Sequence, residues 1–382
     1  MKNKTVGIVT ILKVNNYGAE LQAFALQHKL ELMGYDAEII DYLFYKHPRH
    51  RREGVSKPFY PFPLKGRIRE WLLPLYESLR CLPYAKQKAQ RRERFEAFHR
   101  KHTRFSAKTY TRQSSLYASP PDYDIYVAGS DQVWNPNCYT SLNPYFLTFA
   151  PAGKRRVSYA SSFGVSALPA TAEAGYKRGL EGLDAIAVRE HTGARLVKQL
   201  TGRDATVVAD PTLLLSGDEW LRVASLDKVP SQAYLLLYVL HNSDYITRTA
   251  QQLAQERGLK IVRLCKNAYR QDACDSGIEN VLDAAPDDFI GLFSRATLVL
   301  TNSFHGTVFS NIFHRDFYAI VPRGKDNNSR LVDLLGRIGN TDRLRYEGDV
   351  FKPGPPVDWP AIDEQISALV HESEDYIKRT FL

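Results

Sequence analysis

The residues LVLTNSFHGTVFSNIF, at positions Leu298–Phe313, contain an apolar run that turns directly into a helical pattern. The unbroken apolar run predicts a buried strand, and the apolar residues at helical spacing after it predict a helix. Between them, Asn302 and Ser303 are good N-cap residues. Backbone N–H groups at the start of a helix attract anions. His305 lies on this first turn, where packing alone does not require a histidine, so it is either a hydrogen-bonded residue of the helix start or a ligand-binding side chain.

The same alternation of strand and helix runs through the whole chain. Short apolar runs bounded by turn residues predict strands at 6–12, 37–42, 123–129, 156–162 and 184–190, and again at 233–240, 259–265, 297–301 and 317–322. Helical patterns separate most of these runs, which is typical of parallel sheets. We therefore predict an α/β fold of two doubly wound Rossmann-like domains that face each other across a cleft, with ligands beyond the carboxyl ends of the strands.

The predicted domain boundaries follow from these runs and from the chain length. A chain of 382 residues exceeds what a single hydrophobic core usually supports. We assign residues 1–212 to an N-terminal domain, which includes a basic helical insertion at about 46–105. Residues 213–350 form the predicted C-terminal domain, and 351–382 form a helical tail that packs back toward the N-terminal domain.

Composition narrows the class of protein. No apolar run is long enough to span a bilayer, and the basic start of the chain leads into a predicted strand rather than a signal sequence. The four cysteines are scattered without a C-x-x-C pair, and no His, Asp or Glu cluster has metal-ligand spacing. The first strand-to-helix turn has one glycine, Gly18, where a dinucleotide site would have three. We therefore expect a cytoplasmic protein with neither a metal nor a bound cofactor.

Positive charge is concentrated in the insertion. The segment from Lys46 to Arg104 has 6 Lys and 11 Arg against 5 Glu, a net charge of +12 in a chain whose net charge is +9. One explanation is a helical cap with a solvated basic face. Another is a patch that binds anionic lipid head groups or an acidic saccharide carrier, as a peripheral contact at the inner face of the cell membrane. A nucleic-acid site is disfavoured, because the aromatic residues are grouped beside prolines rather than interleaved with the cations.

Polar residues follow several predicted strands, at the edge where ligands are expected. Asp131 and Gln132 follow one strand of the first domain, and Arg189 lies where another strand becomes a helix. Lys325 and Arg330 lie in a polar loop after the last main strand. Each has a simpler explanation, because an aspartate can cap a turn and an arginine can pair with a neighbouring carboxylate.

An ordered series of blocks extends this pattern over most of the chain: NNYGAELQAFALQ, GSDQVWN, YASSFG, REHTGARLV, DPTLLL, TNSFHGTVFSNIF and NNSRLVDLL. Together they resemble the polysaccharide pyruvyl transferase family, from about Val6 to Arg343. The resemblance implies a fold like that of the B-type glycosyltransferases (GT-B). It also implies an activity, the transfer of a pyruvyl group from phosphoenolpyruvate to a pair of sugar hydroxyls as a cyclic ketal, with release of phosphate. Better-studied members of the family have Arg and Leu directly before the motif histidine, where this chain has Ser303 and Phe304.

The implied reaction gives the strand-end residues possible roles. His305 would deliver a proton or bind phosphate as an imidazolium, and Asp131 would act as a base toward a sugar hydroxyl. Phosphoenolpyruvate, as donor substrate, would be bound by Arg189, Ser303, Lys325 and Arg330, with Lys325 or Arg330 replacing the missing arginine. The acceptor would be bound by turn residues of the first domain, namely Asn16, Tyr17, Gln22, Gln132, Trp134 and Asn135.

The expected acceptor is a galactose- or mannose-like residue of a cell-surface polysaccharide, such as a capsule or exopolysaccharide, or of its lipid-linked precursor. The N-terminal domain would bind this oligosaccharide and the C-terminal domain the donor. Two alternatives fit the same fold. One is a nucleotide-sugar-dependent glycosyltransferase. The other is a non-catalytic saccharide-binding relative, which would account for Ser303 and Phe304 in place of the family's Arg and Leu. No nucleic-acid partner is expected.

Overall fold

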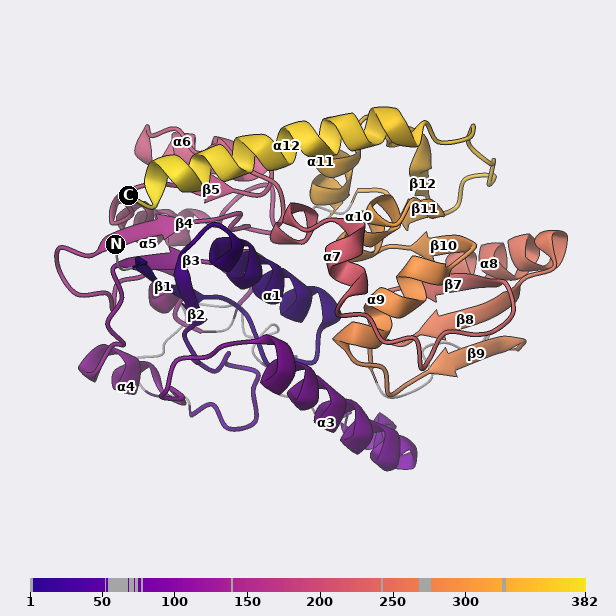
Figure 1. The fold of residues 1–382 in the computed structure, drawn as a ribbon, viewed down its shortest axis with the longest axis horizontal. Coiled ribbons are helices and arrows are strands. Elements are labelled where there is room, and N and C mark those ends of the chain that lie inside the picture. Colours follow the sequence, from indigo (N-terminus) through magenta and orange to yellow (C-terminus); the bar gives the residue numbers. More distant parts are fainter. Residues whose placement is uncertain are drawn as a thin grey trace. The chain divides into compact units, whose positions relative to one another are not determined.

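The computed structural model describes residues 3–51, 53, 68, 72, 75–76, 78–138, 140–241, 243–267, 276–324 and 328–382. Their contacts divide the chain into two units, which are described separately (Figure 1). Unit 1 comprises Met1–Leu75, Arg100–Leu214 and Ala368–Leu382, and unit 2 comprises Tyr76–His99 and Leu215–Ser367. The basic insertion and the C-terminal tail therefore each contribute residues to both units.

Unit 1 is built on a parallel sheet. Its strands are β1 (Thr5–Val9), β2 (Asp36–Ile39), β3 (Ile125–Ala128) and β4 (Arg155–Ser158), in the order β2-β1-β3-β4. Single bridges beyond β4 lead to β5 (Ala187–Val188), which pairs with β6 (Thr206–Val207). The strand order reverses between β1 and β3. Doubly wound sheets bind their ligands beyond the carboxyl ends of the strands at such a point.

Helices connect the strands of unit 1. They are α1 (Tyr17–Leu32), α4 (Gln113–Ala118), α5 (Ala170–Glu181) and α6 (His191–Thr201), with 3-10 turns at Asn143–Phe146 and Pro211–Leu214. The C-terminal part of α12 (Trp359–Thr380) also packs on this unit. There Tyr376 donates a hydrogen bond to the Ser158 carbonyl at 2.9 Å, and Ser373 Oγ accepts one from Ala209 N at 2.8 Å.

Unit 2 is built on a second parallel sheet. Its strands are β7 (Tyr234–Tyr238), β8 (Lys260–Leu264), β9 (Ile278–Val281), β10 (Leu298–Thr301), β11 (Asp316–Val321) and β12 (Leu344–Tyr346). Its helices are α7 (Gly217–Leu221), α8 (Asp244–Arg257), α9 (Pro286–Arg295), α10 (Phe304–Ile312) and α11 (Ser329–Arg337), with 3-10 turns at Leu82–Tyr84 and Thr341–Arg343. The order β12-β11-β10-β7-β8-β9 is the Rossmann order, and it reverses between β7 and β10.

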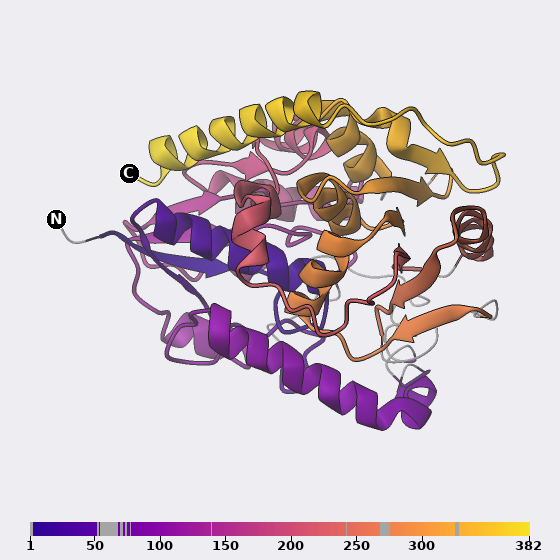
Figure 2. The same ribbon diagram turned by 45° about the vertical axis from the view of Figure 1, so that its right-hand side comes forward.

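Helix α3 (Ala85–His102) comes from the basic insertion, and its residues up to His99 belong to unit 2 (Figure 2). The Arg91 guanidinium donates hydrogen bonds to the carbonyls of Cys265, at 2.8 Å, and Lys266, at 2.9 Å, directly after β8. Arg94 pairs with Asp288 of α9 at 2.7 Å. Two cations of the insertion thus bind within the protein, so its basic face is not entirely solvated.

The two parallel sheets confirm the predicted α/β class. The predicted strand at 37–42 ends at Ile39, the last residue that pairs with β1, and Tyr42 forms a single bridge with Tyr110 instead. Strands β6, β9 and β12 were not predicted, since each is short and contains polar residues. Within the described ranges, no helix is both long and apolar enough to cross a membrane.

Candidate active site

Polar side chains join the two central strands of unit 2 where the strand order reverses. Thr301 Oγ1, at the end of β10, donates a hydrogen bond to the Tyr238 carbonyl, at the end of β7, at 2.6 Å. Asn302 Oδ1 accepts a hydrogen bond from Leu240 N at 2.7 Å. The two strand ends are therefore held in fixed register at the point where a doubly wound sheet binds its ligand.

Helix α10 begins directly beyond these strand ends. Ser303 is its N-cap, since Ser303 Oγ accepts a hydrogen bond from Gly306 N at 3.3 Å. The Ser303 side chain is also hydrogen-bonded to the Tyr238 hydroxyl, and burial raises the pKa of Tyr238, so that hydroxyl stays protonated. His305 lies on the first turn, where 8% of its surface is exposed and its ring is edge-on to Phe304. The turn therefore places an imidazole beside the N–H groups of a helix start.

Gly306 lets α10 approach β10 closely. A Cβ atom at this position would lie 2.3 Å from Thr301 Oγ1, and that hydroxyl is fixed by its hydrogen bond to Tyr238. We expect Gly306→Ala to lower the free energy of unfolding by about 1–3 kcal/mol, measured by urea denaturation. If Gly306→Ala lowers the free energy of unfolding less in a Thr301→Ala background, the clash is with the Thr301 side chain.

Gly336, in α11, is the matched control for that substitution, because a Cβ atom at this position would have no other atom within 4 Å. Gly336→Ala should leave stability unchanged or raise it by up to about 1 kcal/mol, since alanine favours helix. Equal effects of the two substitutions would contradict the close approach of α10 to β10.

Further charged residues lie at the carboxyl edge of the unit 2 sheet. Arg91 binds the carbonyls that follow β8, and the neighbouring strand β7 leads to His241. The His241 ring lies 3.5 Å from the Glu347 carboxylate, which follows β12. Arg330 lies half-buried on the first turn of α11, and Lys325 lies outside the described residues. Unit 2 thus carries the guanidinium groups of Arg91 and Arg330 and the His241 imidazole on the side of the sheet where α10 begins.

In unit 1, carboxylates surround Arg189. Its Nη1 donates a hydrogen bond to Asp210 at 2.8 Å, and its other nitrogens lie 3.6 Å from Asp131 and 3.8 Å from Glu190. Only 2% of the Arg189 side chain is exposed. Burial by itself lowers the pKa of this guanidinium, but the charges of Asp210, Asp131 and Glu190 outweigh burial and raise the pKa above its usual value. Arg189 is therefore a permanent buried cation.

Hydroxyl groups fix two of these carboxylates. Thr212 donates hydrogen bonds to Asp210 from its backbone N, at 3.0 Å, and from Oγ1, at 2.6 Å. Ser162 Oγ donates one to Glu190 at 2.8 Å. The side chains of Asp210 and Glu190 are 0% and 4% exposed, whereas that of Asp131 is 15% exposed. Of the three, Asp131 is the carboxylate that solvent or a substrate can reach.

The backbone at the same edge of unit 1 adopts an uncommon conformation. Lys13 and Asn15 after β1, Asp131 after β3 and Ala160 after β4 all have positive φ, between 50° and 72°. Left-handed backbone is uncommon for non-glycine residues and clusters at functional sites. These residues make the carboxyl edge of this sheet the candidate functional edge of unit 1.

Comparison with known families decides the class of the protein. The model of a family described as polysaccharide pyruvyl transferase matches residues 16–323, which include Asp131, Arg189 and His305. The chain belongs to the polysaccharide pyruvyl transferase family. No curated protein gave a match.

Solved structures show the fold type of this pyruvyl transferase family member. A protein described as UDP-N-acetylglucosamine 2-epimerase from Listeria monocytogenes is 11% identical, with a TM-score of 0.51, and the match covers 98% of this chain and 90% of the other. The UDP-GlcNAc 2-epimerase from Neisseria meningitidis is 10% identical, with a TM-score of 0.48 and coverages of 98% and 93%. The match with the Listeria protein and the two parallel sheets confirm the predicted Rossmann-like, GT-B type of fold.

Three residues predicted to bind the acceptor are buried in this family member. Trp134 is fully buried, donates a hydrogen bond from Nε1 to the Tyr145 carbonyl at 2.9 Å and stacks on Phe146. Tyr17 and Gln22 are buried as well. These side chains offer no surface to a saccharide. Trp134 belongs to the hydrophobic core of unit 1, and Gln22 Nε2 donates hydrogen bonds to Thr10 Oγ1 at 3.0 Å and to the Ala19 carbonyl at 2.8 Å.

The remaining predicted acceptor residues lie nearer the surface. Asn16 caps α1, because its Oδ1 accepts a hydrogen bond from Gly18 N at 3.1 Å. Gln132 and Asn135 are partly exposed and hydrogen-bonded to each other. They pack over Gly164, where a Cβ atom would lie 2.3 Å from Gln132 Oε1. Asn16 and this amide pair are the parts of the predicted acceptor site that the structure leaves accessible.

Sequence analysis missed two charged residues of these clusters. Asp210 is the closest carboxylate to Arg189, and it belongs to the DPTLLL block, in which the sequence alone assigns the aspartate no role. Arg91 counts in the sequence only as part of a basic run, although it reaches the carboxyl edge of the unit 2 sheet. The available signal was its helical spacing to Phe95 and Phe98, which predicts one face for the three residues, and both phenylalanines are buried as Arg91 is.

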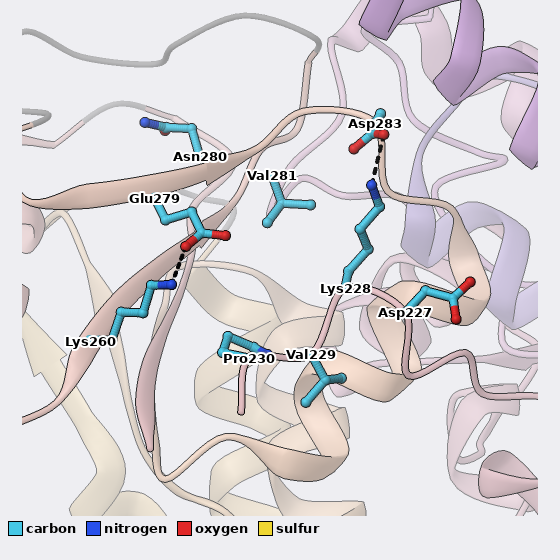
Figure 3. Close-up of a pocket in the computed structure, with 9 residues that line it drawn as sticks. All are labelled: Asp227, Lys228, Val229, Pro230, Lys260, Glu279, Asn280, Val281 and Asp283. Carbon is cyan, nitrogen blue, oxygen red and sulfur yellow. Dashed lines mark hydrogen bonds and ion pairs between the residues drawn. The ribbon is translucent and has the colours of Figure 1, made fainter. Parts of the chain in front are cut away.

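A cavity of about 290 Å³ in unit 2 lies away from α10, along β8 and β9 (Figure 3). Its lysines face carboxylates in the cavity wall, since Lys228 pairs with Asp283 at 2.8 Å and Lys260 pairs with Glu279. We do not assign this cavity to the active site, because both of its lysines are paired with carboxylates of the wall. In the part of the chain that the structure describes, no group of three or more His, Cys, Asp or Glu residues could hold a metal ion.

Proposed function

We propose that this protein transfers a pyruvyl group from phosphoenolpyruvate to two hydroxyls of a saccharide, forming a cyclic ketal and releasing phosphate. The observation that carries the proposal is His305, which the family match includes and which lies on the first turn of α10 beside the strand reversal of unit 2. A helix start suits a donor that has both a phosphate and a carboxylate. The acceptor belongs to a cell-surface polysaccharide or its precursor.

The chemistry requires few groups. A proton is added to the methylene carbon of phosphoenolpyruvate, and one sugar hydroxyl attacks the adjacent carbon and loses its proton. The second hydroxyl then replaces phosphate at that carbon and closes the ring. One hydroxyl proton is thus balanced by the new methyl group and the other by the phosphate that leaves. The protein must supply an acid, a base and fixed positive charge.

In this proposal His305 delivers the proton or binds the phosphate, and Asp131 accepts a proton from the acceptor. Ser303, Arg330 and Lys325 bind the donor, and Arg91 supplies a further guanidinium at the same edge of unit 2. For Arg189 the proposal replaces the donor-binding role that the sequence predicts. Since its side chain is buried against Asp210 and lies 3.6 Å from Asp131, it acts as a positioning residue for these two carboxylates.

Thermal denaturation with phosphoenolpyruvate tests the proposal. A ligand at 100 times its Kd adds about 2.7 kcal/mol to the free energy of unfolding, which raises Tm by several degrees in a chain of this size. We expect this rise with phosphoenolpyruvate, a smaller rise with inorganic phosphate at equal concentration, and none with pyruvate. The His305→Ala variant should lose most of the rise.

Thermal denaturation and an assay of phosphate release separate the alternatives. A rise with a sugar nucleotide and none with phosphoenolpyruvate would replace the reaction by glycosyl transfer. Binding of phosphoenolpyruvate without phosphate release over a panel of galactosides and mannosides would favour a non-catalytic relative.

A further inference from the structure

The segment that leads into α3 exposes an unusual number of large apolar side chains. Of the thirteen that are exposed in the described part of the chain, six lie between Ile68 and Leu82. Three belong to unit 2, namely Tyr76, Leu79 and Leu82, which are 55%, 57% and 66% exposed. The others, Ile68, Leu72 and Leu75, come before them at helical spacing in the sequence. Exposed apolar side chains that gather in this way mark an interaction surface.

Several contacts attach this segment to unit 2. Cys81, between two of the exposed leucines, is buried. Farther along, Arg91 binds the carbonyls of Cys265 and Lys266, and Arg94 pairs with the fully buried Asp288. The exposed leucines are therefore presented by an anchored part of the fold.

Cations lie next to these apolar side chains. The exposed ones are Arg80, Lys86, Lys88 and Arg92. Between Lys65 and Arg92 the sequence has 8 Lys or Arg residues and 2 Glu. The exposed acids of α3, Glu93 and Glu96, come later in the helix. Apolar side chains beside clustered cations are typical of helices that lie on a membrane surface.

We propose that Tyr76, Leu79 and Leu82, together with Arg80, Lys86 and Lys88, form a surface that docks on a bilayer containing anionic lipids. The leucines enter the head-group region, and the cations interact with lipid phosphates. A second copy of the chain would bring an equal positive charge to the same place. Nucleic acid would leave the aliphatic side chains in water. The proposal is independent of the reaction.

Vesicle flotation of the full-length protein tests the docking surface. We expect the protein to float with vesicles of phosphatidylcholine containing about one third phosphatidylglycerol and to stay in the bottom fraction with phosphatidylcholine alone. The variant Leu79→Ser/Leu82→Ser should bind the anionic vesicles about tenfold more weakly. Lys86→Glu/Lys88→Glu should lose binding to a similar extent, and high salt should reduce binding of the wild type.

The matched control is Leu221→Ser/Leu226→Ser, which changes two exposed leucines elsewhere in unit 2 and should float like the wild type. Circular dichroism and thermal denaturation check that each variant is folded. The proposal is overturned if the wild type fails to float with anionic vesicles, or if Leu79→Ser/Leu82→Ser floats as well as the wild type. A dimer in gel filtration that this variant dissociates would assign the surface to self-association and would also overturn it.

Discussion

Replacing His305 with alanine is expected to lower the rate of pyruvyl transfer by about 10²- to 10⁴-fold, the usual contribution of a general acid or base. The fold should tolerate the change, because the N-cap hydrogen bond of α10 comes from Ser303 and not from His305. Phosphate release from phosphoenolpyruvate, in the presence of galactose- and mannose-containing oligosaccharides, measures the rate. Urea denaturation checks that the variant is as stable as the wild type to within about 1 kcal/mol.

His314, just beyond the C-terminal end of α10, is the matched control. It is exposed, pairs with Asp363 at 2.9 Å and stacks on Trp359. His314→Ala should keep the full rate of phosphate release. A His305→Ala variant that also kept the full rate would remove His305 from the chemistry, whatever its effect on stability.

Replacing Arg189 with methionine should have the largest effect on stability. Removing the guanidinium leaves Asp210, Asp131 and Glu190 close together in a buried site without their cation. Removing one partner of a buried ion pair costs about 3–5 kcal/mol. We therefore expect the free energy of unfolding at pH 7, measured by urea denaturation, to fall by that amount. The loss should shrink as the pH falls, because carboxylates that become protonated no longer need the cation.

Arg195, exposed on helix α6 shortly after Arg189 in the sequence, provides the control for this variant. Arg195→Met should change stability by no more than about 0.5 kcal/mol. Equal unfolding midpoints for Arg189→Met and Arg195→Met would show that the carboxylate cluster does not depend on Arg189.

The parts of the fold that local sequence determines were predictable. The stretch Leu298–Phe313 contains both the apolar run of β10 and the helical spacing of α10, so the turn that carries His305 follows from neighbouring residues alone. By contrast, β9 lies at the edge of its sheet and contains Glu279 and Asn280, and its pairing with β8 is what makes it a strand.

The candidate site was less predictable, because its contacts join distant parts of the chain. Arg189 and Asp210 are separated by 21 residues, and nothing in either block indicates that they meet. For Trp134 the sequence misleads in the other direction. Its position after a strand end suggests a binding residue, but residues distant in the sequence bury it. Its burial depends on Phe146 and on Tyr176, whose hydroxyl donates a hydrogen bond to the Trp134 carbonyl across 42 residues.

The left-handed residues at the strand ends of unit 1 affect how the sequence can change over time. Glycine would relax the backbone at Lys13, Asn15, Asp131 and Ala160, which adopt positive φ. Such a replacement gains on the order of 1 kcal/mol where a non-glycine side chain is strained. A copy of the chain released from selection for catalysis is therefore free to gain glycine at these positions. In the reaction proposed above Asp131 is the base, so glycine in its place is expected to mark descendants that have lost the activity.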